Sequence, residues 1–574
     1  MSEIKSLPMG WEMSQIGQVC EPSQYGYTAK AASNGNYHYL RTTDITKSEL
    51  NWENVPFCEI SDGEAEKYLL KDNDVVISRA GSIGYSYLIS KARKSVFASY
   101  LIRFRPLLNP KYFRYFLDTQ QYWDAISEGS SGIAVQNVNA KTLSLIDLPI
   151  APEKEQTEIV EKLDEAFSDL DAGVKELKTA QTKLTQYTQS LFKSAMAGSF
   201  TKKWREKNND STQETGQQLL ERILIKRREQ WQQKKLEEFK AKDKTPSKGW
   251  QDKYPEPIKP DITDLPELPE GWVWASLSQI GWLDRGKSKH RPRNAEHLYG
   301  GDYPFVQTGE IRSAEQYIKK TNKTYSEDGL KQSKLWPKGT MCITIAANIG
   351  ETAILGIEAC FPDSIVGFST IIDDMPIEYV EYVFRVLKHK LNDEAPATAQ
   401  KNINLEILSK EAIPLPPVKE QLTLVEMLTI EIENIKHQKN ATALGLKQSE
   451  AQRKNILKSA FSGQLVPQVP SYEPATVLLE KIQKEREKLA KAAKSRNPSQ
   501  SKKKVNVMDT LLKVLTSEDK WLDAQDAFRK CGVVNNTSTD EIEKLYLELR
   551  ELVAKGLVEV LKKDKMDKLR IIKK

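Results

Sequence analysis

Side chains along one long stretch of the chain, from Glu153 to Ala197, follow a repeat of alternating steps of three and four residues. The stretch contains no proline and a single interior glycine, Gly173. At 1.5 Å per residue, its ~45 residues would form a helix of ~67 Å, which is too long for an ordinary core helix. The repeating positions are Val160, Leu163, Phe167, Leu170, Val174, Leu177, Gln181, Leu184, Thr188, Leu191 and Ala195. This spacing predicts a coiled-coil seam.

A second stretch begins with the same spacing and then weakens. Its first seam positions are the hydrophobic Val425, Leu428, Ile432 and Ile435, and its later ones are the polar Lys439, Thr442, Ser449 and Arg453. Because a polar seam residue costs stability but fixes register, we expect the two long helices to pair with each other and to leave surface for another protein. The alternative, two independent helices packed on their own domains, leaves their length unexplained.

The two stretches belong to a tandem repeat that covers most of the chain. The offset between matching blocks drifts only between 261 and 266 residues, so both halves are expected to share one architecture. The matching blocks are Leu7–Trp11 with Leu268–Trp272, Ser14–Gly17 with Ser278–Gly281, Val76–Gly84 with Cys342–Gly350, Leu148–Gln156 with Ile413–Gln421, and Leu191–Gly198 with Ile456–Gly463.

Ahead of each long helix, the pattern changes to short apolar runs separated by turn residues. In the first half, strands are predicted at Val75–Ser78, Ser86–Ile89 and Tyr100–Phe104, and an amphipathic helical segment at Lys111–Ile126. Each half therefore carries an α/β or α+β domain of ~140 residues. The expected boundaries are 1–150 and 266–416 for these domains, 151–200 and 417–465 for the long helices, 201–265 and 466–504 for basic helical linkers, and 505–574 for a further domain.

The last segment lies outside the repeat. It predicts helices at Val507–Leu515, Leu522–Lys530 and Asp540–Lys555, followed by strands at Leu557–Leu561 and Leu569–Ile572. This order resembles a small winged-helix domain. Such a domain contacts DNA or a partner protein, and its nearly balanced charge, 14 basic against 13 acidic residues, favours protein.

Composition narrows the class of protein. The chain has 574 residues, of which 39% are hydrophobic and 29% are charged, as in soluble globular proteins, and no apolar run approaches the ~18 residues of a membrane span. Its start lacks the layout of a signal peptide, so we expect a cytoplasmic location. The five cysteines lie far apart, which favours buried free thiols over disulfides or a zinc site.

Positive charge is concentrated in two short stretches. Residues 201–250 carry 14 basic and 8 acidic groups, residues 481–504 carry 10 and 2, and the net charge of the whole chain is only +6. Both stretches read as polar helices. Either they are solvated helix faces, or they contact phosphates along a duplex, because lysine and arginine bind phosphates regardless of base sequence.

Catalytic motifs are missing from the sequence. It contains no phosphate-binding Gly-x-x-x-x-Gly-Lys loop, no dinucleotide fingerprint, no His-Glu-x-x-His, and no Asn/Asp-Pro-Pro-aromatic loop of an adenine methyltransferase. The five histidines do not fall at metal-ligand spacing. We therefore expect no catalytic residue, no metal and no cofactor in this chain.

Candidate DNA-binding groups occur where loops are expected. In the second half, a run places five cations at every second residue, which an extended chain would direct to one side. These cations are Arg285, Lys287, Lys289, Arg291 and Arg293. Such an edge follows phosphates, and its guanidinium groups match the acceptors of guanine. The matching segment of the first half, Glu21–Lys30, has no such run, so the two copies are expected to differ in the groups that they contact.

Other loop residues have side chains that pair with base edges, although each is also typical of an exposed turn. They are Arg41, Thr42, Thr43, Arg79, Ser82, Ser130, Ser131, Gln136 and Asn137 in the first half, and Gln307, Thr308, Arg312, Asn348, Gln400, Lys401 and Asn402 in the second.

Taken in order, these motifs resemble a family, the DNA-specificity subunits of type I restriction-modification systems. The resemblance rests on the Leu-Pro-x-Gly-Trp opening of each half, the Asp74–Gly84 segment, the Gln400–Asn404 loop and the Pro-x-x-x-Glu-Gln start of each long helix. It covers residues 1 to about 500. Each motif is short, but their duplicated order is specific.

The resemblance implies a function and partners. In that family, each globular part is a target recognition domain that reads half of a bipartite asymmetric DNA site, and the two long helices pack antiparallel as a spacer. Two modification subunits supply adenine methyltransferase chemistry with S-adenosylmethionine, and restriction subunits add translocation and nuclease activity with ATP and Mg. The alternatives are a stand-alone DNA-binding regulator or coiled-coil scaffold without a methyltransferase and, after it, an enzyme acting alone.

Overall fold

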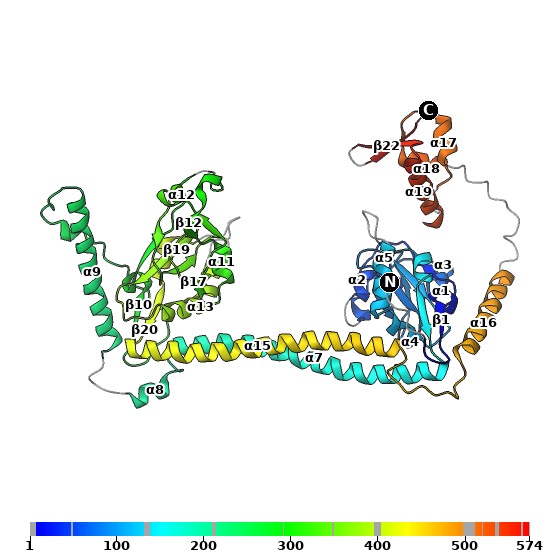
Figure 1. Ribbon diagram of the computed structural model, residues 1–574, viewed down its shortest axis with the longest axis horizontal. Helices are drawn as coiled ribbons and strands as arrows, with labels where there is room; N and C mark the ends of the chain where they lie inside the picture. The colour runs from blue at the N-terminus through cyan, green and yellow to red at the C-terminus, as the bar shows by residue number, and fades with distance from the viewer. Residues whose placement is uncertain are drawn as a thin grey trace. The chain divides into compact units, whose positions relative to one another are not determined.

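The structure, a computed structural model (Figure 1), describes most of the chain. The described residues are 7–46, 50–130, 138–208, 214–290, 292–346, 349–394, 403–496, 511–518, 520–533, 539–563 and 566–572. They divide into two compact units, one of residues 1–114, 125–153 and 470–574, and one of residues 115–124 and 154–469. Each unit holds one of the two predicted recognition domains.

The recognition domain of the first unit is built from short strands in three groups. Strand β1 (Glu12–Gln15) pairs antiparallel with β9 (Asp147–Ile150), which joins the start of the domain to its end. One sheet has the order β2 (Gln24–Tyr25), β8 (Leu101–Phe104), β5 (Val75–Ser78), β6 (Ser86–Leu88), and the other has the order β4 (Phe57–Cys58), β3 (Tyr37–Leu40), β7 (Ser95–Phe97). All residues of β5 and β8 are buried, which explains their apolar composition.

Short helices connect these strands. They are α1 (Ile16–Val19), α2 (Thr42–Ile45), η1 (Trp52–Asn54), α3 (Asp62–Tyr68), α4 (Pro110–Phe116), α5 (Gln120–Ser130) and α6 (Ala140–Ser144). The strands predicted at 75–78, 86–89 and 100–104 are confirmed within one residue. The amphipathic segment predicted at 111–126 is helical but divided into α4 and α5, where Thr119 Oγ1 donates to the Phe116 carbonyl and accepts from the Tyr122 N–H.

The recognition domain of the second unit repeats this plan with longer strands. Strand β10 (Val273–Ser276) pairs antiparallel with β20 (Ala412–Leu415). One sheet has the order β11 (Gly281–Arg285), β19 (Ile365–Thr370), β16 (Met341–Thr344), β17 (Thr352–Leu355), β13 (Tyr317–Ile318), and the other has the order β14 (Lys323–Tyr325), β12 (Tyr299–Phe305), β18 (Ala359–Cys360), β15 (Leu335–Trp336). Its helices are α10 (Leu277–Ile280), η3 (Glu296–Leu298), α11 (Thr308–Ser313), α12 (Glu327–Lys331), α13 (Ile377–Glu394) and α14 (Leu405–Lys410).

The duplication extends to single hydrogen bonds. The Tyr112 hydroxyl donates to the Pro149 carbonyl at 2.9 Å, and the Tyr379 hydroxyl donates to the Pro414 carbonyl at 2.6 Å. Both bonds tie a helix of the domain, α4 (Pro110–Phe116) or α13 (Ile377–Glu394), to the last strand of that domain. The two halves of the repeat therefore share side-chain packing as well as strand order, as the matching sequence blocks predicted.

A buried carboxylate joins the two repeated motifs of the second half. Trp272 of the Leu-Pro-x-Gly-Trp motif donates its indole N–H to Glu420 Oε2 at 2.8 Å, and Glu420 belongs to the Pro-x-x-x-Glu-Gln motif. Its other oxygen, Oε1, accepts from Thr201 Oγ1 and from the Arg205 guanidinium, both at 2.5 Å. The glycine before the tryptophan, Gly271, has φ +85°, a conformation that favours glycine.

The long helices are α7 (Glu153–Met196) and α15 (Val418–Phe461), 44 residues each. Arg453 of α15 forms an ion pair with Asp171 of α7, and the Tyr187 hydroxyl of α7 donates to Glu431 Oε2 of α15 at 3.3 Å. Residue numbers rise along α7 as they fall along α15, so the helices run antiparallel, and Figure 1 shows them side by side. The predicted pairing of the two helices is confirmed.

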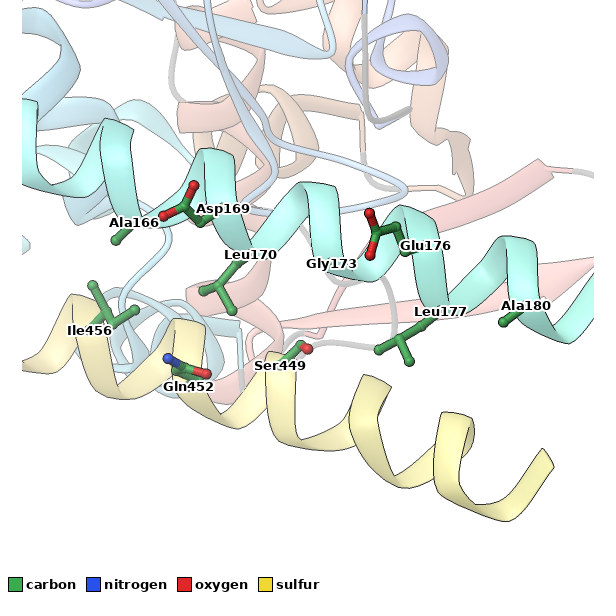
Figure 2. A pocket seen from close by; sticks show the side chains of 10 residues that line it. All are labelled: Ala166, Asp169, Leu170, Gly173, Glu176, Leu177, Ala180, Ser449, Gln452 and Ile456. Carbon is green, nitrogen blue, oxygen red and sulfur yellow. The ribbon is translucent and has the colours of Figure 1, made fainter. Parts of the chain in front are cut away.

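The seam between α7 and α15 is only partly covered. Every predicted seam position of α7 is buried or half-buried, with Leu163, Phe167 and Leu191 buried near the ends and Leu170 and Leu177 half-buried in the middle. Figure 2 shows Leu170 and Leu177 facing α15 across a groove of about 670 Å³. The groove is lined by Ala166, Asp169, Leu170, Gly173, Glu176, Leu177 and Ala180 of α7 and by Ser449, Gln452 and Ile456 of α15.

Helices also form in the segments expected to be basic linkers. They are α8 (Lys202–Lys207), α9 (Gly216–Ala241), η2 (Trp250–Lys253) and α16 (Ala475–Arg496). The Gly216 N–H donates to the Gly271 carbonyl at 2.7 Å, and the Ala475 N–H donates to the Gly10 carbonyl at 2.8 Å. Helices α9 and α16 thus begin on the same turn of the two recognition domains, which extends the duplication beyond the long helices.

The C-terminal segment folds as helix, strand, two helices and two strands. The elements are α17 (Leu511–Glu518), β21 (Leu522–Asp523), α18 (Ala524–Lys530), α19 (Thr539–Ala554), β22 (Val558–Lys563) and β23 (Met566–Ile571). The strands form one antiparallel sheet of order β21-β23-β22. The predicted winged-helix-like order of elements is confirmed.

All five cysteines are free and buried, as predicted, and burial raises the pKa of the Cys58 thiol to about 11. Among the described residues, every helix is too short or too polar to span a bilayer.

We expect Glu420→Ala to lower the free energy of unfolding of the second unit by about 3 kcal/mol, because it leaves the Arg205 charge and the Trp272 N–H without their shared acceptor. Glu426→Ala on the exposed side of α15 is the matched control and should change stability by less than ~0.5 kcal/mol. Urea unfolding followed by tryptophan fluorescence measures both. A Glu420→Ala effect as small as that of the control would contradict the assigned role of this carboxylate.

Candidate nucleic-acid interface

The first candidate surface is an edge strand that differs between the two domains, β2 in one and β11 in the other. The Gly26 N–H donates to the Leu101 carbonyl at 3.1 Å, and the Gly286 N–H donates to the Ile365 carbonyl at 2.9 Å. A Cβ on Gly26 would lie 2.1 Å from the Ala98 carbonyl oxygen, and a Cβ on Gly286 would lie 2.3 Å from that of Pro362. Because only glycine fits, the backbone follows the same path in both domains.

The side chains around these glycines differ in kind. The first domain has Tyr25 and Tyr27 on either side of its glycine, and the second has Arg285 and Lys287. The pairing is supported by the next backbone bond, because the Tyr27 N–H donates to the Phe97 carbonyl and the Lys287 N–H to the Phe361 carbonyl. The predicted divergence of the two copies at this position therefore corresponds to aromatic residues in one domain and cations in the other.

The cation run of the second domain is extended, as predicted. Arg285, Lys287 and Lys289 are exposed, whereas Gly286 and Ser288 between them are buried. The alternation places the three cations on the solvent side of the edge. Arg291 lies outside the described residues.

An acidic residue that the sequence did not indicate lies among these cations. Asp363 accepts from Arg293 NH2 with both carboxylate oxygens at 2.9 Å, and its backbone carbonyl accepts from Arg285 Nε at 2.9 Å. Asp363 follows Arg293 by 70 residues, so no local pattern could reveal the pair. The carboxylate holds Arg293 in place and cancels part of its charge, whereas the Asp363 backbone carbonyl holds Arg285. Within the described residues, Arg285, Lys287 and Lys289 are therefore the cations of the run without an ion pair.

Two of the other candidates occupy matching positions at the start of short helices. The Arg41 N–H donates to Asp44 Oδ2 at 2.8 Å ahead of α2, and the Gln307 N–H donates to Glu310 Oε2 at 2.7 Å ahead of α11. The Arg41 guanidinium also bonds Asp44, and this hydrogen bonding raises the pKa of Arg41. Thr42, Thr43 and Thr308 lie in the first turns of these helices. Thr42 and Thr308 are half-buried, whereas Thr43 and Arg312, at the end of α11, are exposed.

Arg79 was predicted to lie in a loop, but its side chain is buried. Its side chain is 7% exposed and its guanidinium carbon lies 4.8 Å from the centre of the Tyr25 ring. The corresponding residue of the second domain is the buried Ile345, and the backbone carbonyls of both accept at 3.0 Å, from Val138 and Ile403 respectively. A direct contact between Arg79 and DNA would require the side chain to leave this position.

Two exposed tyrosines near Arg79 were not indicated by the sequence. Tyr85 and Tyr100 are 47% and 62% exposed. They lie near Ser82, a predicted candidate, which is exposed in the turn after β5. Tyr100 precedes β8, and its carbonyl accepts from the Arg79 N–H at 2.9 Å. Aromatic residues in loops give no periodic signal, and only the fold brings these two to one place.

The remaining candidates are not described at the side-chain level. Ser130 ends α5, and its side chain lies outside the description. Ser131, Gln136, Asn137, Arg291, Asn348, Gln400, Lys401 and Asn402 lie outside the described residues and stay predictions. Among the described residues, no three His, Cys, Asp or Glu side chains are grouped as a metal site would require.

We expect Lys287→Gln with Lys289→Gln to weaken binding to all DNA sequences alike, because lysines that neutralise phosphates release counterions without reading bases. The slope of log affinity against log salt should fall by ~0.9 for each phosphate that the variant no longer neutralises. Lys410→Gln, which removes a lysine paired with Glu406 on α14, is the control. Fluorescence anisotropy at several salt concentrations measures the slopes, and an unchanged slope for the double variant would mean that this edge faces away from DNA.

Comparison with known proteins gives a family for this duplicated framework. Residues 8–179 and 269–443 match the family described as "Type I restriction modification DNA specificity domain". The two matched segments fall on the two halves of the repeat and together make up more than half of the chain.

Relatives with curated names agree with this match. The type I restriction enzyme StySPI specificity subunit of Salmonella potsdam is 25% identical over 231 residues, which are 38% of this chain and 50% of that protein. The EcoKI specificity subunit of Escherichia coli is 26% identical over 219 residues, 35% of this chain and 46% of that protein. The chain thus matches about half the length of these relatives.

A protein chain of known structure shares the fold. It comes from work on complex assembly and conformational transition of the type I R-M system, and it matches with a TM-score of 0.55 at 15% identity, over 80% of this chain and 100% of that one. With both matched segments on the duplicated domains, this chain belongs to the family of type I restriction-modification DNA specificity proteins.

Proposed function

We propose that this chain reads two separate groups of bases in a bipartite, asymmetric DNA site, one with each recognition domain. One observation carries the proposal: the backbone around Gly26 and Gly286 is the same, whereas the flanking side chains are tyrosines in one domain and cations in the other. A shared frame with different contact side chains suits two readers that recognise different half-sites.

The helix pair is proposed to act as a spacer between the two readers. Each recognition domain leads directly into one long helix, and the two helices are antiparallel. A helix of 44 residues is ~66 Å long and stiff compared with a loop. Bases between the half-sites would then be free to vary, because only their number matters.

Methyltransferase and restriction subunits are the proposed partners, with two modification subunits docking on this chain. The groove between α7 and α15 supports a docked helix, because Leu170, Leu177 and Ile456 remain partly exposed there (Figure 2). Under this proposal, S-adenosylmethionine, ATP and Mg bind to those subunits, and this chain supplies only the choice of DNA site.

The C-terminal domain is proposed to contact protein. Its third helix, α19, which in DNA-binding winged-helix domains enters a groove, carries five acidic and two basic residues and would repel phosphates. Tyr546, Leu547 and Val553 on this helix are 55%, 58% and 42% exposed. Acidic charge with exposed apolar side chains fits a protein surface better than a duplex.

Replacing residues 1–150 with the first recognition domain of another family member tests the two-reader proposal. We expect one half of the methylated sequence to change and the other half and the gap to stay, because the second domain and the helices are untouched. Methylome sequencing of cells that carry the chimaera together with the methyltransferase subunits measures this. Changes in both halves would contradict independent reading, and the absence of any sequence-dependent methylation would favour the stand-alone regulator.

Lengthening both long helices by one heptad tests the spacer. The register of the Arg453–Asp171 and Tyr187–Glu431 contacts brings Gln181 opposite Lys439, so seven residues inserted after each keep the seam in phase. The pair grows by ~10 Å, and the gap should grow by about three base pairs while both half-sites stay the same. Insertion into α7 alone is the control, since an unmatched heptad must bulge. An unchanged gap at full methylation efficiency for the double insertion would exclude the helices as the spacer.

A further inference from the structure

Half of the net +6 charge of residues 201–250 lies in residues 240–250, at the far end of helix α9 and beyond the part that packs on the recognition domain. The first half of α9 is fixed to that domain. Leu219, Leu220 and Ile223 are buried, and the buried Arg227 donates to the Ser278 carbonyl at 3.1 Å and to the Tyr254 hydroxyl at 2.7 Å. The helix therefore projects from the recognition domain in a defined direction.

Aromatic packing fixes the return of the chain after α9. The Trp231 ring stacks on Trp250 with centroids 5.8 Å apart, Phe239 lies edge-on to Trp250 at 5.9 Å, and Tyr254 lies edge-on to Trp231 at 5.4 Å. These contacts clamp η2 against the helix. The turn formed by residues 240–253, which includes η2, is thus held at both ends by packed aromatic rings.

The turn carries lysines that do not take part in ion pairs. Lys240, Lys242, Lys244, Lys248 and Lys253 are all exposed, and none forms an ion pair within the described part of the chain, whereas Lys226 and Lys235 earlier in α9 pair with Glu229 and Glu238. Only two acidic residues, Asp243 and Asp252, lie in the turn. We refer to these five lysines as the lysine turn.

The lysine turn lies at the same end of the second unit as the Arg285–Arg293 edge. Figure 1 shows the end of α9 and helix α12 both away from α7 and α15. The cation edge lies beside α12, because the His290 N–H donates to Gln332 Oε1 and Ser333 Oγ donates to the Lys287 carbonyl. Both groups of cations therefore lie on segments at the side of the second unit that is away from the helix pair.

We propose that the lysine turn binds phosphates of duplex DNA outside the half-site read by the second recognition domain, independently of base sequence. The inference rests on the proposed DNA-reading function and adds to it a second contact with the same duplex. Lysine suits this task, because its ammonium group is a mobile point charge that follows a phosphate chain without the fixed geometry needed to read a base. Exposed lysines with few acidic neighbours also retain their full charge for a polyanion.

The other half of the repeat has the same helix in the same place, which argues against a chance surface feature. Helix α16 buries Leu478 and Ile482, and Arg486 NH1 donates to the Gln18 carbonyl at 3.1 Å, as Arg227 does to Ser278. The exposed Lys488 and Lys491 follow on α16. A cationic helix is therefore attached at one matching site of each reader.

The test replaces all five lysines of the lysine turn with glutamine in the full chain, assembled with its methyltransferase subunits. The recognised sequence is read first from methylation, and the domain exchange identifies the half-site of the second domain. Two duplexes are then compared by anisotropy, one extended by about 20 base pairs beyond that half-site, roughly two helical turns, and one ending at it. The control variant is Lys226→Gln with Lys235→Gln, which removes the paired lysines of the same helix.

On the extended duplex, the slope of log affinity against log salt should fall by ~0.9 for each phosphate that the variant no longer neutralises, about 3 if three lysines bind phosphate. The base preference should not change, and on the short duplex the variant and the unmodified chain should have equal slopes. The control variant should match the unmodified chain on both duplexes. Because the five side chains are exposed, the thermal unfolding midpoint of the variant should also match.

Equal slopes on the extended duplex, or an equal fall in slope on both duplexes, would overturn the inference. Weaker assembly with the methyltransferase subunits at an unchanged salt slope would overturn it too, and would assign this surface to a protein contact. These results differ from failure of the proposed function, in which the unmodified assembly itself would show no preference between the recognised site and an unrelated sequence.

Discussion

The buried carboxylate of Glu420 joins a recognition domain, the segment of helix α8 and a long helix, and the arrangement of the second unit depends on this junction. It accepts from Trp272 at the start of a recognition domain and from Thr201 and Arg205 around helix α8, and it belongs to the first turn of a long helix. A charge buried to this degree is stable only when all its acceptor positions are used, so these segments must meet in one geometry. In the first half, the matching Glu155 is buried and accepts from Gln468 at 2.6 Å.

This junction explains why the two repeated motifs go together. The Leu-Pro-x-Gly-Trp turn supplies a glycine at positive φ and an indole donor, and the Pro-x-x-x-Glu-Gln start supplies the acceptor. Strand pairs β1–β9 and β10–β20 then bring the ends of each recognition domain together. The frame of the second domain is thereby fixed where it meets α15, and its outer edge is left to vary.

The variation is confined to side chains because the backbone has no room to change. At Gly26 and Gly286 the strand passes so close to a neighbouring carbonyl that a Cβ cannot fit, whereas the residues on either side are half-buried tyrosines in the first domain and exposed cations in the second. Tyrosines in one copy and cations in the other thus occupy equivalent positions without altering the fold. At the edge of the second domain, where the cations are exposed, specificity can change at little cost in stability, because substitutions there disturb little of the packed interior.

The sequence by itself determined the duplication, the long helices and their seam, because these follow from periodicity and from a constant offset along the chain. It also located the cation run, since alternation in an extended chain is local. It did not reveal the Asp363 carboxylate beside Arg293, the burial of Arg79 against Tyr25, or the attachment of α9 and α16 to the recognition domains. Those depend on contacts between residues tens to hundreds of positions apart, and only the tertiary structure brings such residues together.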